Sequence, residues 1–204
     1  MGILICGMNG TGKSTLGRVL ARRLNFEFID NEDLYFAKED ASYPFANPRS
    51  REEAVRILEE RIARSNRFVF AAVRGDYGDK LIAALDFAVL LETPKAVRMQ
   101  RVRQRSHQKF GDRILAGGDL FERETAWFSL VNSRPEDYAV KGLEKISCPV
   151  LRVDGTLPIE ESDGCRPGLQ LTGFWDYFAY ERPQLFGKVE MAYLSTLDAD
   201  TLAA

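Results

Sequence analysis

Cysteine is scarce in this sequence, and so are histidine and long apolar runs. The three cysteines stand far apart, at positions 6, 148 and 165, without a CxxC pair. This spacing fits reduced thiols better than a disulfide framework or a zinc site. The N-terminal apolar run at residues 2–6 is too short for a signal peptide or a membrane span. We therefore expect a reducing cytoplasmic setting and no membrane partner.

An excess of positive charge is also absent. The chain carries 28 Lys and Arg against 30 Asp and Glu, a formal net charge of −2. No global basic field is available to recruit nucleic acid, so we expect no nucleic-acid partner, and any positive patch must be local. With 204 residues, 45% of them hydrophobic, the chain is long and apolar enough for one globular domain with a sizeable core.

Short apolar runs alternate with helical periodicity from the first residue onward, without an internal repeat. Runs of this kind suit a parallel sheet that is covered on both faces. The sequence therefore predicts a three-layer α/β domain with a five-stranded parallel sheet. The expected strands are residues 2–6, 26–29, 67–73, 87–91 and 150–153, and the expected helices are 13–24, 51–65, 93–106 and 119–133.

Two segments interrupt this alternation. Residues 39–49 contain two prolines, and residues 107–118 contain three glycines. We expect both to be mobile excursions, the first within an acceptor region at about 30–65 and the second a lid. The tail 162–204, rich in aromatic residues and broken by prolines, is predicted to be a C-terminal extension of the 1–161 domain.

The strongest motif is GMNGTGKS at residues 7–14, which matches G-x-x-x-x-G-K-[ST] between a predicted strand and a predicted helix. Its glycines let backbone N–H groups face a polyphosphate, and the helix dipole adds positive potential. Lys13 would neutralise β- and γ-phosphate charge, and the Ser14 hydroxyl would ligate Mg²⁺. ATP with Mg²⁺ is the expected cofactor, bound by Gly7, Asn9, Gly10, Thr11, Gly12, Lys13, Ser14 and Thr15.

From Lys13 onward the chain resembles the P-loop nucleoside monophosphate and small-molecule kinases, namely adenylate, shikimate and gluconate kinases. FIDNE at 28–32 resembles the F-x-D-x-D segment of shikimate kinases, which binds Mg²⁺ and acceptor; this implies Asp30 as a metal ligand. RVRQR at 101–105 resembles the start of the adenylate kinase lid, which implies Arg101 on adenine and Arg105 on phosphate. VDGTLP at 153–158 is similar to the run beside adenine, which implies contacts from Gly155 and Thr156.

A local basic cluster surrounds the predicted lid. Arg101 and Arg105 are one helical turn apart and so share a face, while Arg113 stands in a loop flanked by glycine. Phosphoryl transfer needs charge neutralisation around the moving group, and arginines on a closing lid provide it. A solvated basic face is the alternative for each arginine taken singly.

The end of the third strand departs from the kinase patterns. AAVRGDYGD at 71–79 lacks the adenylate, shikimate and cytidylate kinase signatures and comes closest to the gluconate-type segment, so the acceptor stays unassigned. Arg74 follows a parallel strand and is a candidate for holding acceptor or γ-phosphate charge. A surface ion pair with Asp76 or Asp79 is the alternative.

An acidic group, Asp30, Glu32 and Asp33, follows the second strand. One carboxylate could orient Mg²⁺-bound water and another the acceptor hydroxyl. The alternative is that these carboxylates cap a helix N-terminus, and for Asp33 this role is predicted as readily as a catalytic one. The neighbouring aromatics Tyr35, Phe36, Tyr43 and Phe45 could clasp an acceptor ring or serve only in packing.

These features favour an ATP- and Mg²⁺-dependent phosphotransferase that moves the γ-phosphate to a small polar metabolite or nucleotide. Lys13, Asp30, Arg74, Arg105 and Arg113 are the predicted catalytic residues. A nucleotide-binding regulatory or adaptor protein with slow ATP hydrolysis is the alternative. The sequence leaves open whether the chain is a monomer or a homodimer.

Overall fold

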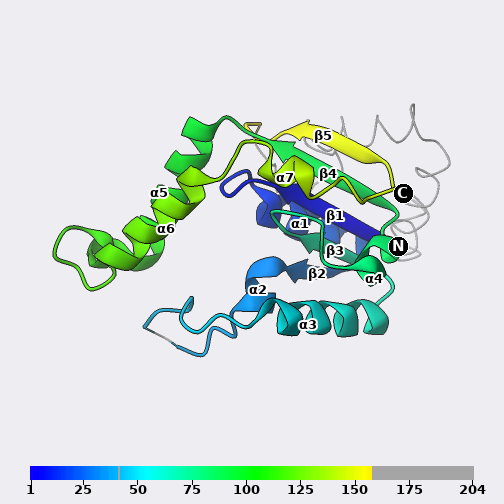
Figure 1. Cartoon of the computed structure of the whole chain (residues 1–204), viewed down its shortest axis with the longest axis horizontal. Helices are drawn as coiled ribbons and strands as arrows, with labels where there is room; N and C mark the ends of the chain where they lie inside the picture. Colours follow the sequence, from blue (N-terminus) through cyan, green and yellow to red (C-terminus); the bar gives the residue numbers. More distant parts are fainter. Residues whose placement is uncertain (41, 158–204) are drawn as a thin grey trace, which may run out of the picture.

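Five parallel strands form the sheet at the centre of the molecule (Figure 1). The structure, a computed structural model, describes residues 1–40 and 42–157. The predicted 162–204 extension lies outside these residues. Along the sheet the order is β2-β3-β1-β4-β5. The strands are β1 (Gly2–Gly7), β2 (Glu27–Asp30), β3 (Phe68–Ala71), β4 (Phe87–Glu92) and β5 (Val150–Asp154).

The central strand β1 is buried on both faces, which explains its unbroken apolar sequence. Ile3 and Ile5 point into one hydrophobic cluster, and Leu4 and Cys6 point into another on the opposite face. The alternation follows from the two-residue period of a strand. The sheet therefore separates two cores, as a three-layer domain requires.

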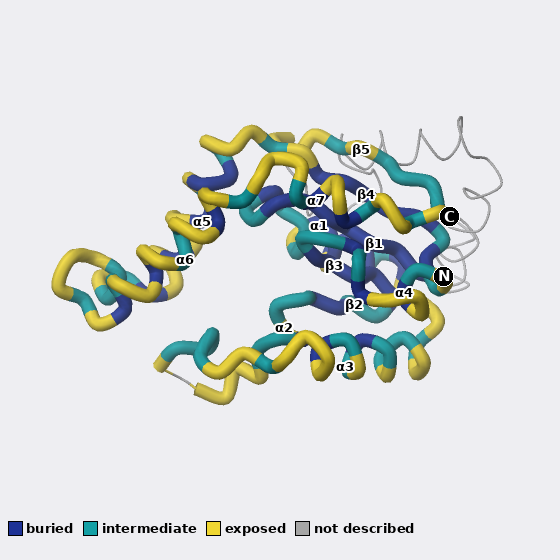
Figure 2. Tube along the Cα trace, viewed as in Figure 1, coloured by how far each residue is buried: buried dark blue, intermediate teal, exposed yellow. Residues whose placement is uncertain are grey.

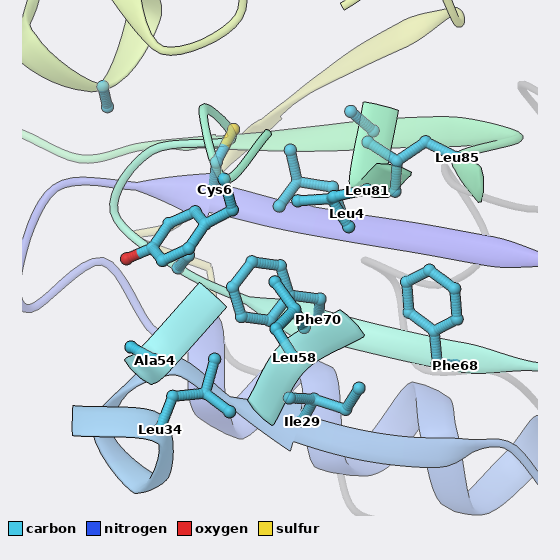
Figure 3. Close-up of a cluster of buried hydrophobic side chains, with 14 of the residues drawn as sticks. Leu4, Cys6, Ile29, Leu34, Ala54, Leu58, Phe68, Phe70, Leu81 and Leu85 are labelled. Atoms are coloured by element: carbon cyan, nitrogen blue, oxygen red, sulfur yellow. The ribbon is translucent and has the colours of Figure 1, made fainter. Parts of the chain in front are cut away.

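Helix α1 (Lys13–Leu24) covers the first face, where Leu16, Val19 and Leu20 pack against β1, β3 and β4. Helices α2 (Asn31–Tyr35), α3 (Arg51–Arg64), α4 (Asp79–Ala84) and α7 (Tyr138–Lys141) belong to the second face. Figure 3 shows Leu58 with Ile29, Phe68 and Phe70 in the core of this face. A reciprocal capping box between Ser50 and Glu53 fixes the start of α3.

Two further helices, α5 (Lys95–Phe110) and α6 (Phe121–Ser133), run side by side away from the sheet (Figure 1). A small core of Met99, Val102 and Val131 joins the two helices. In the sequence, the 3₁₀ helix η1 (Gly111–Ile114) connects the end of α5 to the segment before α6. Much of the surface of this pair is exposed (Figure 2). Helix α5 continues to Phe110, so the segment predicted as an excursion from residue 107 starts as the last turn of a helix.

The predicted fold class, a parallel five-stranded sheet between helices, is confirmed. Because the strands are parallel, their carboxyl ends meet at one edge, where β1 leads into the glycine-rich loop and β2 ends at Asp30. Among the described helices, none is long and apolar enough to cross a membrane.

Candidate active site

The glycine-rich loop between β1 and α1 has the left-handed backbone that its glycines permit. Gly10 has a φ of 84° and Gly12 a φ of 100°, both unfavourable for a residue with a side chain. The Thr11 hydroxyl donates to the Met8 carbonyl oxygen at 2.9 Å and braces the turn from inside. The loop thus ends at the amino terminus of α1, where backbone N–H groups and the helix dipole favour an anion.

The loop is packed tightly against two other parts of the chain. A Cβ atom on Gly10 would lie 2.4 Å from the carbonyl oxygen of Arg98, at the start of α5. A Cβ atom on Gly155, just after β5, would lie 2.4 Å from Thr93 Oγ1 and 2.7 Å from the carbonyl oxygen of Thr11. Glycine at both positions lets these backbones approach, so the start of α5 and the turn after β5 hold the loop in place.

Lys13 is the first residue of α1, and its side chain reaches back to the loop. Its ammonium donates to the carbonyl oxygen of Met8 at 2.9 Å. Burial lowers the pKa of Lys13 to about 8, while the carboxylate of Asp30 opposes this shift and the guanidinium of Arg105 adds to it. A partly buried ammonium that donates to one neutral carbonyl is well placed to transfer its hydrogen bond to a phosphate. Together with the left-handed glycines, this geometry fits the polyphosphate of a nucleotide.

We expect ATP affinity to fall as the pH rises through about 8, because the free protein then loses the Lys13 proton that a phosphate needs as its partner. Titrations with ATP and Mg²⁺ from pH 7 to 9.5, above the phosphate pKa, measure this. The stability contribution of Lys13 should move the other way: its folded pKa lies below the ordinary 10.5, so the unfolded chain holds the proton more tightly and stability rises over that interval. An affinity that stays flat from pH 7 to 9.5 would contradict the assignment, and Lys145→Ala, an exposed lysine, should keep the wild-type profile.

A cavity of about 320 Å³ opens beside the loop at the carboxyl edge of the sheet. It joins residues from the loop, the end of β2, the region after β3 and the α5–α6 pair. Lys13, Ser14, Asp30 and Arg105 are brought together here. The other lining residues are Asn9, Gly10, Asn31, Glu32, Phe36, Tyr43, Phe45, Ala71, Ala72, Val73, Ser106, Lys109, Phe110, Glu124 and Trp127.

Asp30 both caps a helix and faces the cavity. One carboxylate oxygen accepts a hydrogen bond from the Glu32 amide at 3.0 Å, as the N-cap of α2. The other lies 3.5 Å from the Arg18 guanidinium, and the residue is only 8% exposed. The capping and the functional interpretations of Asp30 are therefore compatible. Mg²⁺ is usually held by one or two protein oxygens together with phosphates and water, a requirement that Ser14 and Asp30 fit.

The two lid arginines on α5 occupy different places. Arg105 lines the cavity with Lys109. Arg101 donates to the carbonyl oxygen of Gly155 at 2.6 Å and so connects α5 to the turn after β5. In that turn the Thr156 amide donates to Asp154 at 2.8 Å. Arg101, Gly155 and Thr156, predicted to border adenine, thus share one corner beside the loop.

Arg74 and Arg113 are engaged elsewhere in this structure and do not line the cavity. Arg74 forms a two-point ion pair with Asp76, at 2.9 and 3.1 Å, and lies 4.9 Å from the centre of the Tyr138 ring. Arg113 pairs with Asp119 at 2.6 Å and donates to the carbonyl oxygen of Ser42 at 2.8 Å. Both arginines would have to leave these partners to reach a phosphate at the loop.

Sequence reasoning missed Arg134, which reaches the loop directly. It follows α6 and donates to the side-chain oxygen of Asn9, while its guanidinium packs over the rings of Trp127 and Tyr138. The chain offered one signal: Pro135 predicts that the preceding helix ends there. Nothing local indicated that this end returns to the sheet edge, 125 positions from Asn9 in the sequence.

The aromatic residues near residue 40 divide into two groups. Phe36, Tyr43 and Phe45 line the cavity, whereas Tyr35 packs against the core of the second face. Tyr43 and Phe45 contact Phe110 of α5, with ring centres 5.4 and 6.2 Å apart. Glu124 of α6, another residue that sequence reasoning missed, accepts a hydrogen bond from Tyr43 at 2.9 Å. The two predicted excursions thus meet over the cavity.

Three comparisons place the chain among known proteins. A curated relative, the Uncharacterized protein YqaC of Bacillus subtilis (strain 168), is 28% identical over 167 residues, which cover 78% of this chain and 91% of that protein. An HPr kinase/phosphorylase of Alkaliphilus metalliredigens (strain QYMF) is 62% identical over 45 residues, 22% of this chain and 15% of that protein. A model of the HPr Serine kinase N terminus matches residues 140–204, most of which lie outside the described residues.

Solved structures that resemble the chain include a gluconokinase from Sinorhizobium meliloti 1021 and a shikimate kinase from Aquifex aeolicus vf5. The first is 19% identical, with a TM-score of 0.43, and the match covers 77% of this chain and 83% of that one. The second is 18% identical, with a TM-score of 0.41, and the match covers 78% and 88%. An AAA domain model matches residues 3–122, which include the glycine-rich loop, β1 to β4 and α5. The predicted membership among P-loop proteins is confirmed, and since this match spans more than half of the 204 residues, the chain belongs to the AAA domain family.

Proposed function

We propose that this protein is an ATP- and Mg²⁺-dependent phosphotransferase that moves the γ-phosphate to a hydroxyl or phosphate oxygen of a small polar metabolite or nucleotide. One observation carries the proposal: a single cavity is lined by the Lys13 and Ser14 of a P-loop, by the buried carboxylate of Asp30 and by Arg105. Phosphoryl transfer requires a loop that binds the phosphates, a carboxylate that positions the acceptor or the metal, and cations that offset the phosphate charge.

In this proposal each of these side chains has a defined role. Lys13 and Arg105 hold the oxygens of the moving phosphoryl group and offset the charge that spreads over them in the transition state. Asp30 orients the attacking hydroxyl and accepts its proton. Ser14 and Asp30 would hold Mg²⁺, which would supply positive charge to offset that of the phosphates.

The donor nucleotide would extend from the loop toward Arg101. Its base would lie in the corner formed by Arg101, Gly155 and Thr156, where the arginine is held by the Gly155 carbonyl. Arg134, anchored on Asn9, adds positive potential at the loop, and it contributes to the lowered pKa of Lys13.

In the proposed reaction, Arg74 and Arg113 act only after they have left their present partners. Arg113 reaches the phosphates only when the 107–118 lid releases Asp119 and Ser42, so we assign it to a closed state that differs from this structure. Arg74 would hold an anionic group of the acceptor after exchanging Asp76 for it. The cytoplasmic setting and the choice between monomer and homodimer stay predictions.

We expect ADP release to depend on an acceptor. Purified protein with ATP and Mg²⁺ is incubated with a panel of sugars, sugar acids, polyols, nucleosides and nucleoside monophosphates, and ADP is measured by a coupled assay. At least one polar acceptor should raise the rate by about 100-fold over the rate with water, since a positioned acceptor makes the step effectively unimolecular. Slow ADP release that no acceptor changes would contradict the proposal and favour a nucleotide-binding regulatory protein.

A further inference from the structure

A buried carboxylate on α6 has an oxygen without a hydrogen-bond partner among the described residues. Glu124 is 1% exposed, although it lies in the first turn of a helix whose neighbours Glu122 and Arg123 are exposed. Its Oε1 accepts the hydrogen bond from Tyr43, while its Oε2 is buried and has no such partner. Buried charged oxygens are nearly always paired, because leaving one unpaired costs free energy.

The unpaired oxygen belongs to a residue that lines the cavity beside the P-loop. Aromatic rings surround this end of the cavity. Tyr43 and Phe110 lie with ring centres 5.4 Å apart, and Phe45 meets Tyr43 edge-on at 5.7 Å. Burial and the Glu124 contact raise the pKa of Tyr43 to about 12, so its hydroxyl stays a donor to Oε1 at neutral pH. Of the two Glu124 oxygens, Oε2 is therefore the one without a donor among the described residues, and it would accept from a ligand once the side chain turns toward the cavity.

A positive charge is already in place against these rings. The ammonium of Lys109 lies 4.0 Å from the centre of the Phe45 ring and 5.6 Å from that of Phe110. The cavity lining carries three cationic side chains, Lys13, Arg105 and Lys109. They balance the three carboxylates that line the same cavity, so a cationic ligand gains no net attraction. A neutral, flat ring with an N–H donor suits the site better, since aromatic faces stack on it and the carboxylate accepts its hydrogen bond.

We infer that Glu124, Tyr43, Phe45 and Phe110 form a subsite for the flat ring of the acceptor, and that an exocyclic amino group on this ring donates to Glu124 Oε2. The inference rests on the proposed function and specifies its substrate class: a nucleoside-type acceptor with an amino-bearing base. Lys13, Ser14 and Asp30 line the same cavity, so the base at Glu124 leaves the ribose hydroxyls or a ribose phosphate to face them.

Matched nucleoside pairs test this subsite. Adenosine and purine riboside differ only in the exocyclic amino group, and so do cytidine and 2-pyrimidinone riboside. Each nucleoside is titrated into the protein by calorimetry in the presence of Mg²⁺ and a saturating non-hydrolysable ATP analogue, so that the donor site is filled. In at least one pair the amino-bearing nucleoside should bind about tenfold or more tightly, as expected for a hydrogen bond to a charged group. Glu124→Gln should reduce this preference to about twofold or less, and Glu122→Gln, exposed on the same helix, should leave it unchanged.

Absence of any preference in both pairs would overturn the subsite, as would a preference that survives in Glu124→Gln. The nucleoside preference of the unmodified protein tests the subsite even if Glu124→Gln does not fold. Binding of the ATP analogue is titrated separately. If the analogue binds normally but the paired nucleosides bind equally well, only the proposed subsite is contradicted. If the analogue does not bind, the proposed function is contradicted as well.

Discussion

Lys13→Ala should lower acceptor-dependent ADP release by about 100- to 1,000-fold, the usual loss when one donor to a developing negative charge is removed. The partly buried ammonium lies 2.9 Å from the Met8 carbonyl oxygen of the loop and lines the cavity. The variant should also lose most of the thermal stabilisation by ATP and Mg²⁺. In the unmodified protein a ligand at 100 times its Kd contributes about 2.7 kcal/mol, a readily measured rise in Tm.

The control for this experiment is Lys145→Ala, which removes an exposed lysine outside the cavity. It should retain both turnover and the ligand-induced rise in Tm. If Lys13→Ala shows the same rise as the unmodified protein, the nucleotide does not bind at this loop, and the assignment of the site is wrong.

Asp30→Asn should reduce phosphoryl transfer by about 100-fold or more, because the substitution removes the proposed base. ATP affinity should fall much less, since on the donor side only one Mg²⁺ ligand and the charge that opposes the lowered pKa of Lys13 are lost. Asparagine is as good an N-cap as aspartate, so the hydrogen bond from the Glu32 amide and the start of α2 should persist. The unfolding transition, measured by circular dichroism, should therefore stay close to that of the unmodified protein. Rates of ADP release with the best acceptor, and separate ATP titrations, measure the two effects.

Asp79→Asn makes the same chemical change at an exposed position in the first turn of α4 and should leave activity intact. Full activity of Asp30→Asn would mean that its carboxylate acts only as a cap. The proton acceptor would then have to be sought at Asp33 or Asp76, of which Asp33 pairs with Lys38 and Asp76 with Arg74.

The long elements were predictable because their hydrophobic periods are unambiguous. Helix α1 begins and ends where its periodicity predicts, and the apolar runs of β1 and β4 give their strands within one residue. Helices α2, α4 and α7 were missed, since elements of four to six residues carry too few apolar positions to establish a period. The end of α5 was placed too early because Gly111, not Ser106, provides the C-cap.

For the site, the loop motif was visible in the sequence because its residues are contiguous. Glu124 was not, since a glutamate in the first turn of a helix normally faces solvent, and only the packing of α6 against Tyr43 buries it. For Arg74 the structure shows the ion pair with Asp76 that the sequence offered as the alternative, and its role at the acceptor stays a proposal. The sequence alone does not show which charged side chains line a cavity, because this depends on how the surrounding helices and strands pack.

The close packing of Gly10 against the carbonyl of Arg98 has a consequence for affinity. A loop held between α5 and the turn after β5 has few conformations to lose when a polyphosphate arrives, so little of the binding free energy is spent on ordering it. An alanine at position 10 would meet that carbonyl and would also strain a left-handed backbone. The close packing of the loop and the exclusion of a side chain at position 10 therefore have the same structural origin.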